Sequence, residues 1–221
     1  MFERFTKDAR AVVRGAAEHA DAADAGTVDG GHLLLALLDR EGSRASFALS
    51  ALGLAEPEDS SRRGFRHQDP DRDSAPRDSL PGDSARQSSG RRDSVRRALA
   101  EARRRAGLSR AEADALAGLG IDVAEIVARV EAVHGVGAMA GDRKGKGWWP
   151  GRRTFGREAR DILEKSLRIA LARRDGHIGD EHILLALTAR PGLPAEVLAD
   201  HGVTHESVSR VLYGQGRAKA G

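Results

Sequence analysis

Apolar residues recur at helical spacing near the start of the chain and again 150 residues later. In the first segment the positions i, i+3, i+4, i+7, i+8 and i+11 hold Ala9, Val12, Val13, Ala16, Ala17 and Ala20. In the second segment the same positions hold Ala159, Ile162, Leu163, Ser166, Leu167 and Ala170. This spacing predicts one apolar face on each of two amphipathic helices. We expect Thr6 and Gly156 to cap their starts, and Gly26 and Gly176 to mark their ends.

The similarity between the two segments extends without a gap over residues 5–40 and 155–190. The sequence His-Leu-Leu-Leu-Ala-Leu at 32–37 returns as His-Ile-Leu-Leu-Ala-Leu at 182–187. Such runs are apolar on nearly every side, so each predicts a helix buried at the centre of its repeat. We expect Asp180 to cap the second of these helices, with Glu181 in its first turn.

A third and a fourth helix follow in each copy. Gly53 and Gly202 each precede an apolar residue, so we expect them to be the left-handed residues that end the third helices. The fourth helices are expected near 94–99 and 207–212. An internal repeat fixes the architecture, and here it predicts an all-α fold of two related helical bundles. We place the first repeat at residues 2–134 and the second at 154–214, followed by a tail, 215–221.

Three segments do not match the repeated helices. Residues 56–93 hold only two large apolar residues among Asp, Arg, Ser, Pro and Gly, so we expect a disordered insert within the first repeat. Residues 109–133 contain two capping-box patterns, which predict an extra helical pair. The sequence leaves open whether this pair or the helix at 94–106 closes the first bundle. Residues 135–153 are rich in glycine and basic residues, so we expect them to form a flexible linker.

The composition narrows the possible functions. The 221 residues include no cysteine, which excludes disulfides, thiolate metal sites and a cysteine nucleophile, and favours a reducing compartment. No apolar run approaches the roughly 18 residues of a membrane span, and the start has no signal-peptide pattern. We therefore expect a cytoplasmic protein that has no membrane partner. The formal charge of +3 gives little support to nucleic acid as a partner.

No motif for catalysis stands out. The closest match to a phosphate-binding loop is the segment 141–147, which has one residue too few between its glycines and no Ser or Thr after the lysine. No Ser/His/Asp set and no paired-histidine metal motif has a suitable spacing. The sequence therefore predicts a protein that is not an enzyme and that uses no metal or cofactor.

Three of the repeated motifs resemble the Clp N-terminal repeat domain, the Clp R domain. They are the Phe-Thr-x-x-Ala-Arg opening at 5–10, Glu-His-Ile-Leu-Leu-Ala-Leu at 181–187, and the third-helix ending Leu-x-x-x-Gly-Val at 198–203. The first copy departs from the family at Gly31, where the family has Glu. The resemblance implies a stand-alone domain of the ClpC or ClpA type, without the ATPase modules that follow it in the unfoldases.

The resemblance also implies a non-catalytic function in protein binding. The chain would bind clients, adaptors or small-molecule ligands of a Clp unfoldase, as a modulator, decoy or delivery factor, and its partners would include Clp unfoldase or protease subunits. In the ClpC branch the motif's Glu helps bind arginine-phosphorylated clients, a role that here falls on Glu181, beside Asp180 and His182. The alternative is that Glu181 only stabilises its helix through the dipole. His32 and His182 are interpreted as structural histidines that cap backbone groups.

A second function remains open in the linker. Its cations and aromatic residues are Arg143, Lys144, Lys146, Trp148 and Trp149. Such a mixture can bind single-stranded nucleic acid or an acidic surface, which would make the chain a nucleic-acid-binding regulator. It is also compatible with a tether whose Trp pair packs on a neighbouring bundle.

Overall fold

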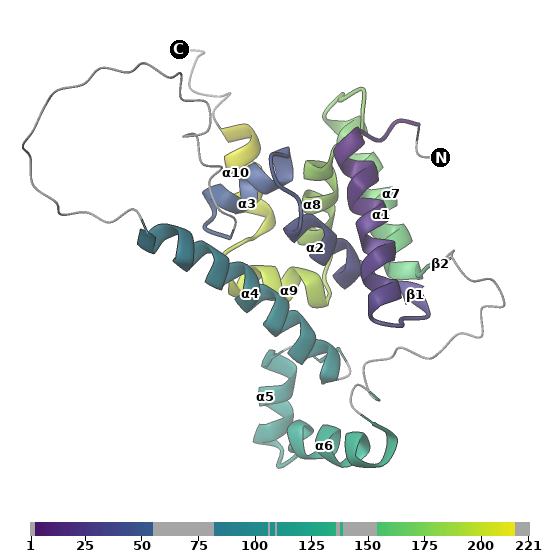
Figure 1. Ribbon diagram of the computed structural model, residues 1–221, viewed down its shortest axis with the longest axis vertical. Helices are drawn as coiled ribbons and strands as arrows, with labels where there is room; N and C mark the ends of the chain where they lie inside the picture. Colours follow the sequence, from purple (N-terminus) through teal and green to yellow (C-terminus); the bar gives the residue numbers. More distant parts are fainter. Residues whose placement is uncertain are drawn as a thin grey trace, which may run out of the picture.

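The computed structural model describes residues 3–54, 82–105, 107–108, 110–135, 138 and 154–214. Within them the chain forms ten helices and one pair of two-residue strands, β1 (Thr27–Val28) and β2 (Thr154–Phe155) (Figure 1). The helices are α1 (Lys7–Ala22), α2 (Gly30–Leu38), α3 (Arg44–Ala51), α4 (Gly82–Arg104), α5 (Arg110–Gly118), α6 (Val123–His134), α7 (Arg157–Ala172), α8 (Asp180–Thr188), α9 (Leu193–Asp200) and α10 (His205–Tyr213). The prediction of an all-α fold of two repeats is confirmed.

The first helices of the two repeats, α1 and α7, begin as predicted but end differently. Thr6 caps α1 by accepting a hydrogen bond from the Ala9 N–H at 3.2 Å, and Gly156 begins α7 without a side-chain cap. The left-handed residues after these helices are Asp24 (φ 49°) and Arg174 (φ 62°), so the prediction that Gly26 and Gly176 mark the ends was wrong. Each end is closed by a backbone bond that spans five residues, such as Ala25 N–H to Ala20 C=O at 2.8 Å.

The second helices, α2 and α8, are the buried centres of their repeats. Their leucines are almost fully buried, as their all-round apolar sequence predicts. Asp29 caps α2, but α8 is preceded by Gly179 as its cap residue, so the prediction that Asp180 is the cap was wrong. Asp180 is the first residue of the helix, and its carboxylate accepts a hydrogen bond from Ala45 of α3. The ring Nδ1 atoms of His32 and His182 accept backbone N–H groups of the cap residues, as expected for structural histidines.

The third helices, α3 and α9, end at left-handed glycines as predicted. Gly53 and Gly202 have φ angles of 83° and 80°. The next residue in each copy donates its N–H back to the helix, from Leu54 to Leu49 C=O at 2.8 Å in the first repeat. This hydrogen-bond pattern satisfies carbonyl groups that the end of a helix leaves open.

The two repeats exchange elements across a pseudo-two-fold axis. Strand β1 of the first repeat pairs in parallel with β2 at the start of the second, and Phe5 at the start of the first repeat bridges Ile178 of the second. The fourth helices exchange in the same way, since α4 packs on α9 and α10 packs on α3. The apolar residues of both repeats consequently form one continuous core.

Helix α4 extends into the segment that was expected to be disordered. It begins at Gly82, so the end of the predicted insert 56–93 is helical, while residues 55–81 lie outside the described residues. Helix α4 also packs on α2, so in the described structure it is α4, rather than the extra pair, that closes the first bundle. Helices α5 and α6 project from the rest of the molecule, at the bottom of Figure 1. Most of the linker 135–153 lies outside the described residues.

Candidate functional site

The starts of three helices meet at one depression of about 270 Å³. The cap residues of α1, α3 and α8 all line it, so the depression faces the positive ends of three helix dipoles. Its lining residues are Thr6, Asp8, Gly42, Ser43, Arg44, Asp175, His177, Gly179, Asp180, Glu181 and His182. The three consecutive residues predicted as a site in the second repeat, Asp180, Glu181 and His182, all line this depression.

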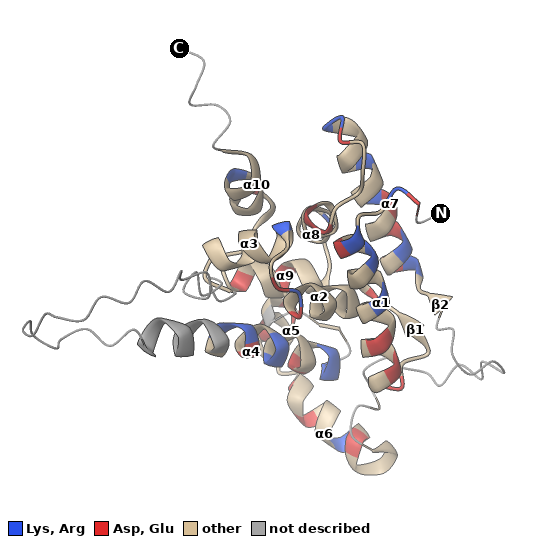
Figure 2. Ribbon diagram, turned by 45° about the horizontal axis from the view of Figure 1, so that its top comes forward, with Lys and Arg blue, Asp and Glu red and all other residues tan. Residues whose placement is uncertain are grey.

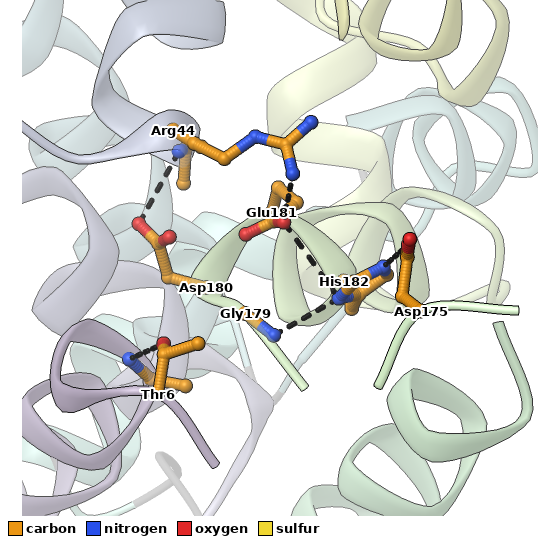
Figure 3. A network of polar contacts seen from close by, with 9 residues as sticks. Thr6, Arg44, Asp175, Gly179, Asp180, Glu181 and His182 are labelled. Carbon is orange, nitrogen blue, oxygen red and sulfur yellow. Dashed lines mark hydrogen bonds and ion pairs between the residues drawn. The ribbon is translucent and has the colours of Figure 1, made fainter. Parts of the chain in front are cut away.

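Glu181 holds a buried carboxylate at this depression. The residue is only 4% exposed, and its Oε1 accepts a hydrogen bond from Arg44 Nη1 at 2.8 Å (Figure 3). Its side chain folds back over Gly179, where a Cβ atom would overlap the carboxylate, so a side chain at this position would displace the carboxylate from its present place. Burial raises the pKa of Glu181 above its usual value, although a backbone hydrogen bond and the positive charge of Arg44 act in the opposite direction.

Asp180 and His182 have structural partners within the fold. Asp180 accepts the N–H of Ala45 at 3.2 Å, and its negative charge lies at the start of α3, where the helix dipole favours it. His182 accepts the Gly179 N–H on Nδ1 at 2.9 Å, so its Nε2 carries the proton and donates to Asp175 Oδ2 at 2.9 Å. These two side chains position the start of α8. Of the three residues, only Glu181 contacts a guanidinium group of the described part of the chain, that of Arg44.

Arg44 was not among the residues predicted from the sequence. It is the first residue of α3, its side chain is largely exposed, and it lies 5.8 Å from the centre of the Tyr213 ring. A cation in the first turn of a helix is disfavoured by the helix dipole, and that unusual placement was a signal of a nearby anionic partner. The internal repeat gave no help, because Leu193, the first residue of α9, occupies the equivalent position of the second copy.

The equivalent region of the first repeat is filled by the chain itself. Arg103 of α4 donates from Nη2 to both carboxylate oxygens of Asp29, at 2.6 and 2.9 Å. A Cβ atom at Gly31 would lie 2.7 Å from the same Arg103 nitrogen, so the guanidinium occupies space that a side chain at Gly31 would need. Glu158 covers the adjacent helix start by accepting the Gly30 N–H at 3.1 Å.

Asp29 is strongly affected by this arrangement. Burial alone would raise its pKa, but the hydrogen bonds from His32 and the positive charge of Arg103 outweigh burial and lower the pKa to about 2. Both repeats thus hold a carboxylate against an arginine of the same chain. In the first repeat the carboxylate comes from the cap residue, and in the second from Glu181.

The basic residues give no assembled nucleic-acid site among the described residues. The predicted linker residues Arg143, Lys144, Lys146, Trp148 and Trp149 all lie outside the part that the structure describes. Figure 2 shows a row of basic residues along α4. Most of these arginines hold the helix in place through partners on other segments. The pairs are Arg92 with the Leu54 carbonyl, Arg96 with Asp39, Arg103 with Asp29, and Arg104 with Glu131.

Comparison with protein families identifies the module. The model of the Clp repeat (R) N-terminal domain matches residues 4–119 and 154–217. The chain belongs to this family. A comparison with curated proteins gave no match. Both matched segments of this Clp repeat domain contain the helix starts that line the depression, since Thr6 and Arg44 lie in the first and Glu181 in the second.

Family membership associates the chain with the Clp chaperone and protease system. The Clp repeat domain is a regulatory N-terminal domain and not a catalytic one. Among the described residues, no helix combines the length and apolar character that a bilayer span requires. The same residues contain no cluster of His, Asp and Glu suited to a metal ion.

Proposed function

We propose that this Clp repeat domain binds segments of client or adaptor proteins at the depression beside Glu181, and that an arginine side chain of the ligand, in its phosphorylated form, is the group recognised. The observation that carries the proposal is the contact between Glu181 and Arg44. The site already holds one guanidinium against a buried carboxylate at 2.8 Å. A ligand arginine would take the place of the Arg44 guanidinium.

The charges around the depression suit a ligand that carries both signs. A phosphoarginine group presents guanidinium N–H donors together with an anionic phosphate. The carboxylate of Glu181 would accept from the donors, while the helix starts and the displaced Arg44 would attract the phosphate. Because the side chain of Arg44 is largely exposed, it can move without opening the core.

The raised pKa of Glu181 supports a role in binding. A buried carboxylate of this kind is harder to ionise in the folded protein than in the unfolded chain. Its ionised form therefore destabilises the fold. Residues whose pKa is shifted and that line a depression are frequent at functional sites. The first repeat would contribute no second site of the same kind, because Arg103 occupies the space beside Gly31.

The test is a calorimetric titration with a phosphoarginine peptide, using the wild type and Glu181→Gln. Loss of a charge-assisted contact of about 1.5–3 kcal/mol predicts affinity about 10- to 100-fold weaker for the variant. Glu164→Gln is the matched control, because Glu164 forms an exposed ion pair with Arg168 on α7 and does not line the depression. Equal affinity of Glu181→Gln and wild type would remove Glu181 from the site, and absence of binding by the wild type would refute the proposed ligand.

A further inference from the structure

The helical pair α5–α6, with the turn that joins it, exposes an unusual amount of apolar surface. Four of the six large apolar residues that are exposed in the described part of the chain lie in this unit. They are Leu119, Ile121, Ile126 and Val133. Ile121 and Ile126 also line a depression of about 290 Å³ together with Glu125 and Arg129. A cluster of this kind on one projecting unit is typical of an interaction surface.

The α5–α6 unit is a third copy of the unit formed by a third and a fourth helix. Gly120 has the same left-handed conformation as Gly202, with φ angles of 82° and 80°. The hydrogen bond across this turn is also the same, since Ile121 N–H reaches Leu116 C=O at 2.9 Å as Val203 N–H reaches Leu198 C=O. Leu116, Gly120 and Ile121 also match Leu198, Gly202 and Val203 in residue type or apolar character, so the similarity holds in sequence and in structure.

The equivalent apolar positions differ sharply in burial. In α9–α10, Val203 and Val208 are completely buried. Their counterparts in the third copy, Ile121 and Ile126, are 41% and 45% exposed. The third copy thus presents toward solvent the residues that face the core in the second repeat.

In the first and second repeats, the apolar face of each unit formed by a third and a fourth helix is buried against the other repeat. Helix α4 packs on α9, and α10 packs on α3, so the units of the first and second repeats are partners of each other in a two-fold arrangement. The α5–α6 unit has no such partner among the described elements. It is joined to α4 through the chain and through the ion pair of Arg104 with Glu131 at 3.0 Å. Helix α6 buries Val123 and Val127, whereas Ile121 and Ile126 stay exposed.

We infer that the partner of the α5–α6 unit is the α5–α6 unit of a second copy of this chain, and that two copies form a symmetric dimer through this surface. The pseudo-two-fold pairing seen inside the chain then becomes a true two-fold pairing between chains. Glu125 and Arg129 carry opposite signs on adjacent turns of α6 and pair with each other within that helix at 2.7 Å, so a second copy can exchange these partners without leaving a charge unpaired. Two antiparallel copies of α6 can therefore place Glu125 of one against Arg129 of the other.

The dimer surface also lies largely beyond the residues that match the family. The first matched segment ends at residue 119, before Ile121 and all of α6. The dimer is accordingly a property of this chain's extra unit and not of the repeat module, and it does not depend on ligand binding at Glu181.

The first experiment is the mass of the full chain in solution as a function of concentration, by sedimentation or light scattering. A surface formed by one short helical pair limits the area that a dimer can bury, so loading should span about 1 µM to 1 mM. The wild type should rise from the chain mass of 23.6 kDa toward twice that value. The double variant Ile121→Asp/Ile126→Asp should remain at the chain mass, and its circular dichroism spectrum should match that of the wild type. Leu171→Asp is the control, since Leu171 is exposed elsewhere, on α7, and should leave the dimer intact.

A crosslinking experiment tests the same surface independently. Because the chain has no cysteine, Ile126→Cys introduces a single thiol close to the inferred two-fold axis. Mild oxidation should give a disulfide-linked dimer for Ile126→Cys and much less for Leu171→Cys. A wild type that stays at the chain mass up to the highest loading would overturn the inference and leave the surface to another protein. A dimer that survives Ile121→Asp/Ile126→Asp would also overturn it.

Discussion

The pair of Asp29 and Arg103 makes a quantitative prediction about stability. Asp29→Asn keeps the helix cap, because asparagine caps as well as aspartate, but removes the charge that Arg103 contacts. The fall of the Asp29 pKa from 3.8 to about 2 corresponds to about 2.4 kcal/mol of stability in the ionised form. Since the Asp29 side chain is 36% exposed, solvent screening reduces the expected loss to about 1–2 kcal/mol.

The pH dependence of this loss is set by the lowered pKa. A lowered pKa stabilises the folded protein above the unfolded pKa of 3.8, and that contribution is lost as the pH falls toward about 2. Urea unfolding followed by circular dichroism, at fixed ionic strength between pH 2 and 7, should therefore show wild type and Asp29→Asn converging at the acid end. Asp114→Asn, on the exposed face of α5, should show no such convergence. A difference between wild type and Asp29→Asn that stays constant over the whole range would refute the reasoning.

Three further predictions concern the second repeat. Burial raises the folded pKa of Glu181, so the wild type should lose stability relative to Glu181→Gln as the pH rises from about 4 to 7; urea unfolding at both pH values checks this, and the opposite trend would contradict it. Gly179→Ala should displace the Glu181 carboxylate and weaken phosphoarginine-peptide binding about 10-fold or more, whereas Gly176→Ala, where a Cβ meets nothing within 4 Å, should not. Asp175→Ala removes the Nε2 partner of buried His182 and should cost about 1–3 kcal/mol in urea unfolding; an unchanged midpoint would show that the contact contributes nothing.

The features that were predicted correctly depend on neighbours close in the sequence. The amphipathic spacing of α1 and α7, the left-handed Gly53 and Gly202, and the capping role of the histidines all involve residues within about one or two turns of a helix. The helix ends at Asp24 and Arg174 were missed for the converse reason. Glycine favours the left-handed conformation, but Schellman-type hydrogen bonds also hold other residues in it.

The features that were missed depend on contacts between distant segments. Arg44 and Glu181 are 137 positions apart, and their pairing follows from the exchange of elements between the repeats. The parallel pairing of β1 with β2 involves only two residues in each strand, too few for an alternating pattern to be visible. The sequence showed that Gly31 replaces the family's Glu. It did not show that Arg103 fills the space beside Gly31.

The reciprocal exchange of β-strands and fourth helices has a consequence for cleavage. If a protease cut the chain between residues 138 and 154, neither fragment would keep a complete core, because α9 would lose α4 and α3 would lose α10. The nicked protein should therefore stay together as a tight two-fragment complex that keeps the depression beside Glu181. Halves produced from two separate genes should for the same reason assemble with each other into one working unit.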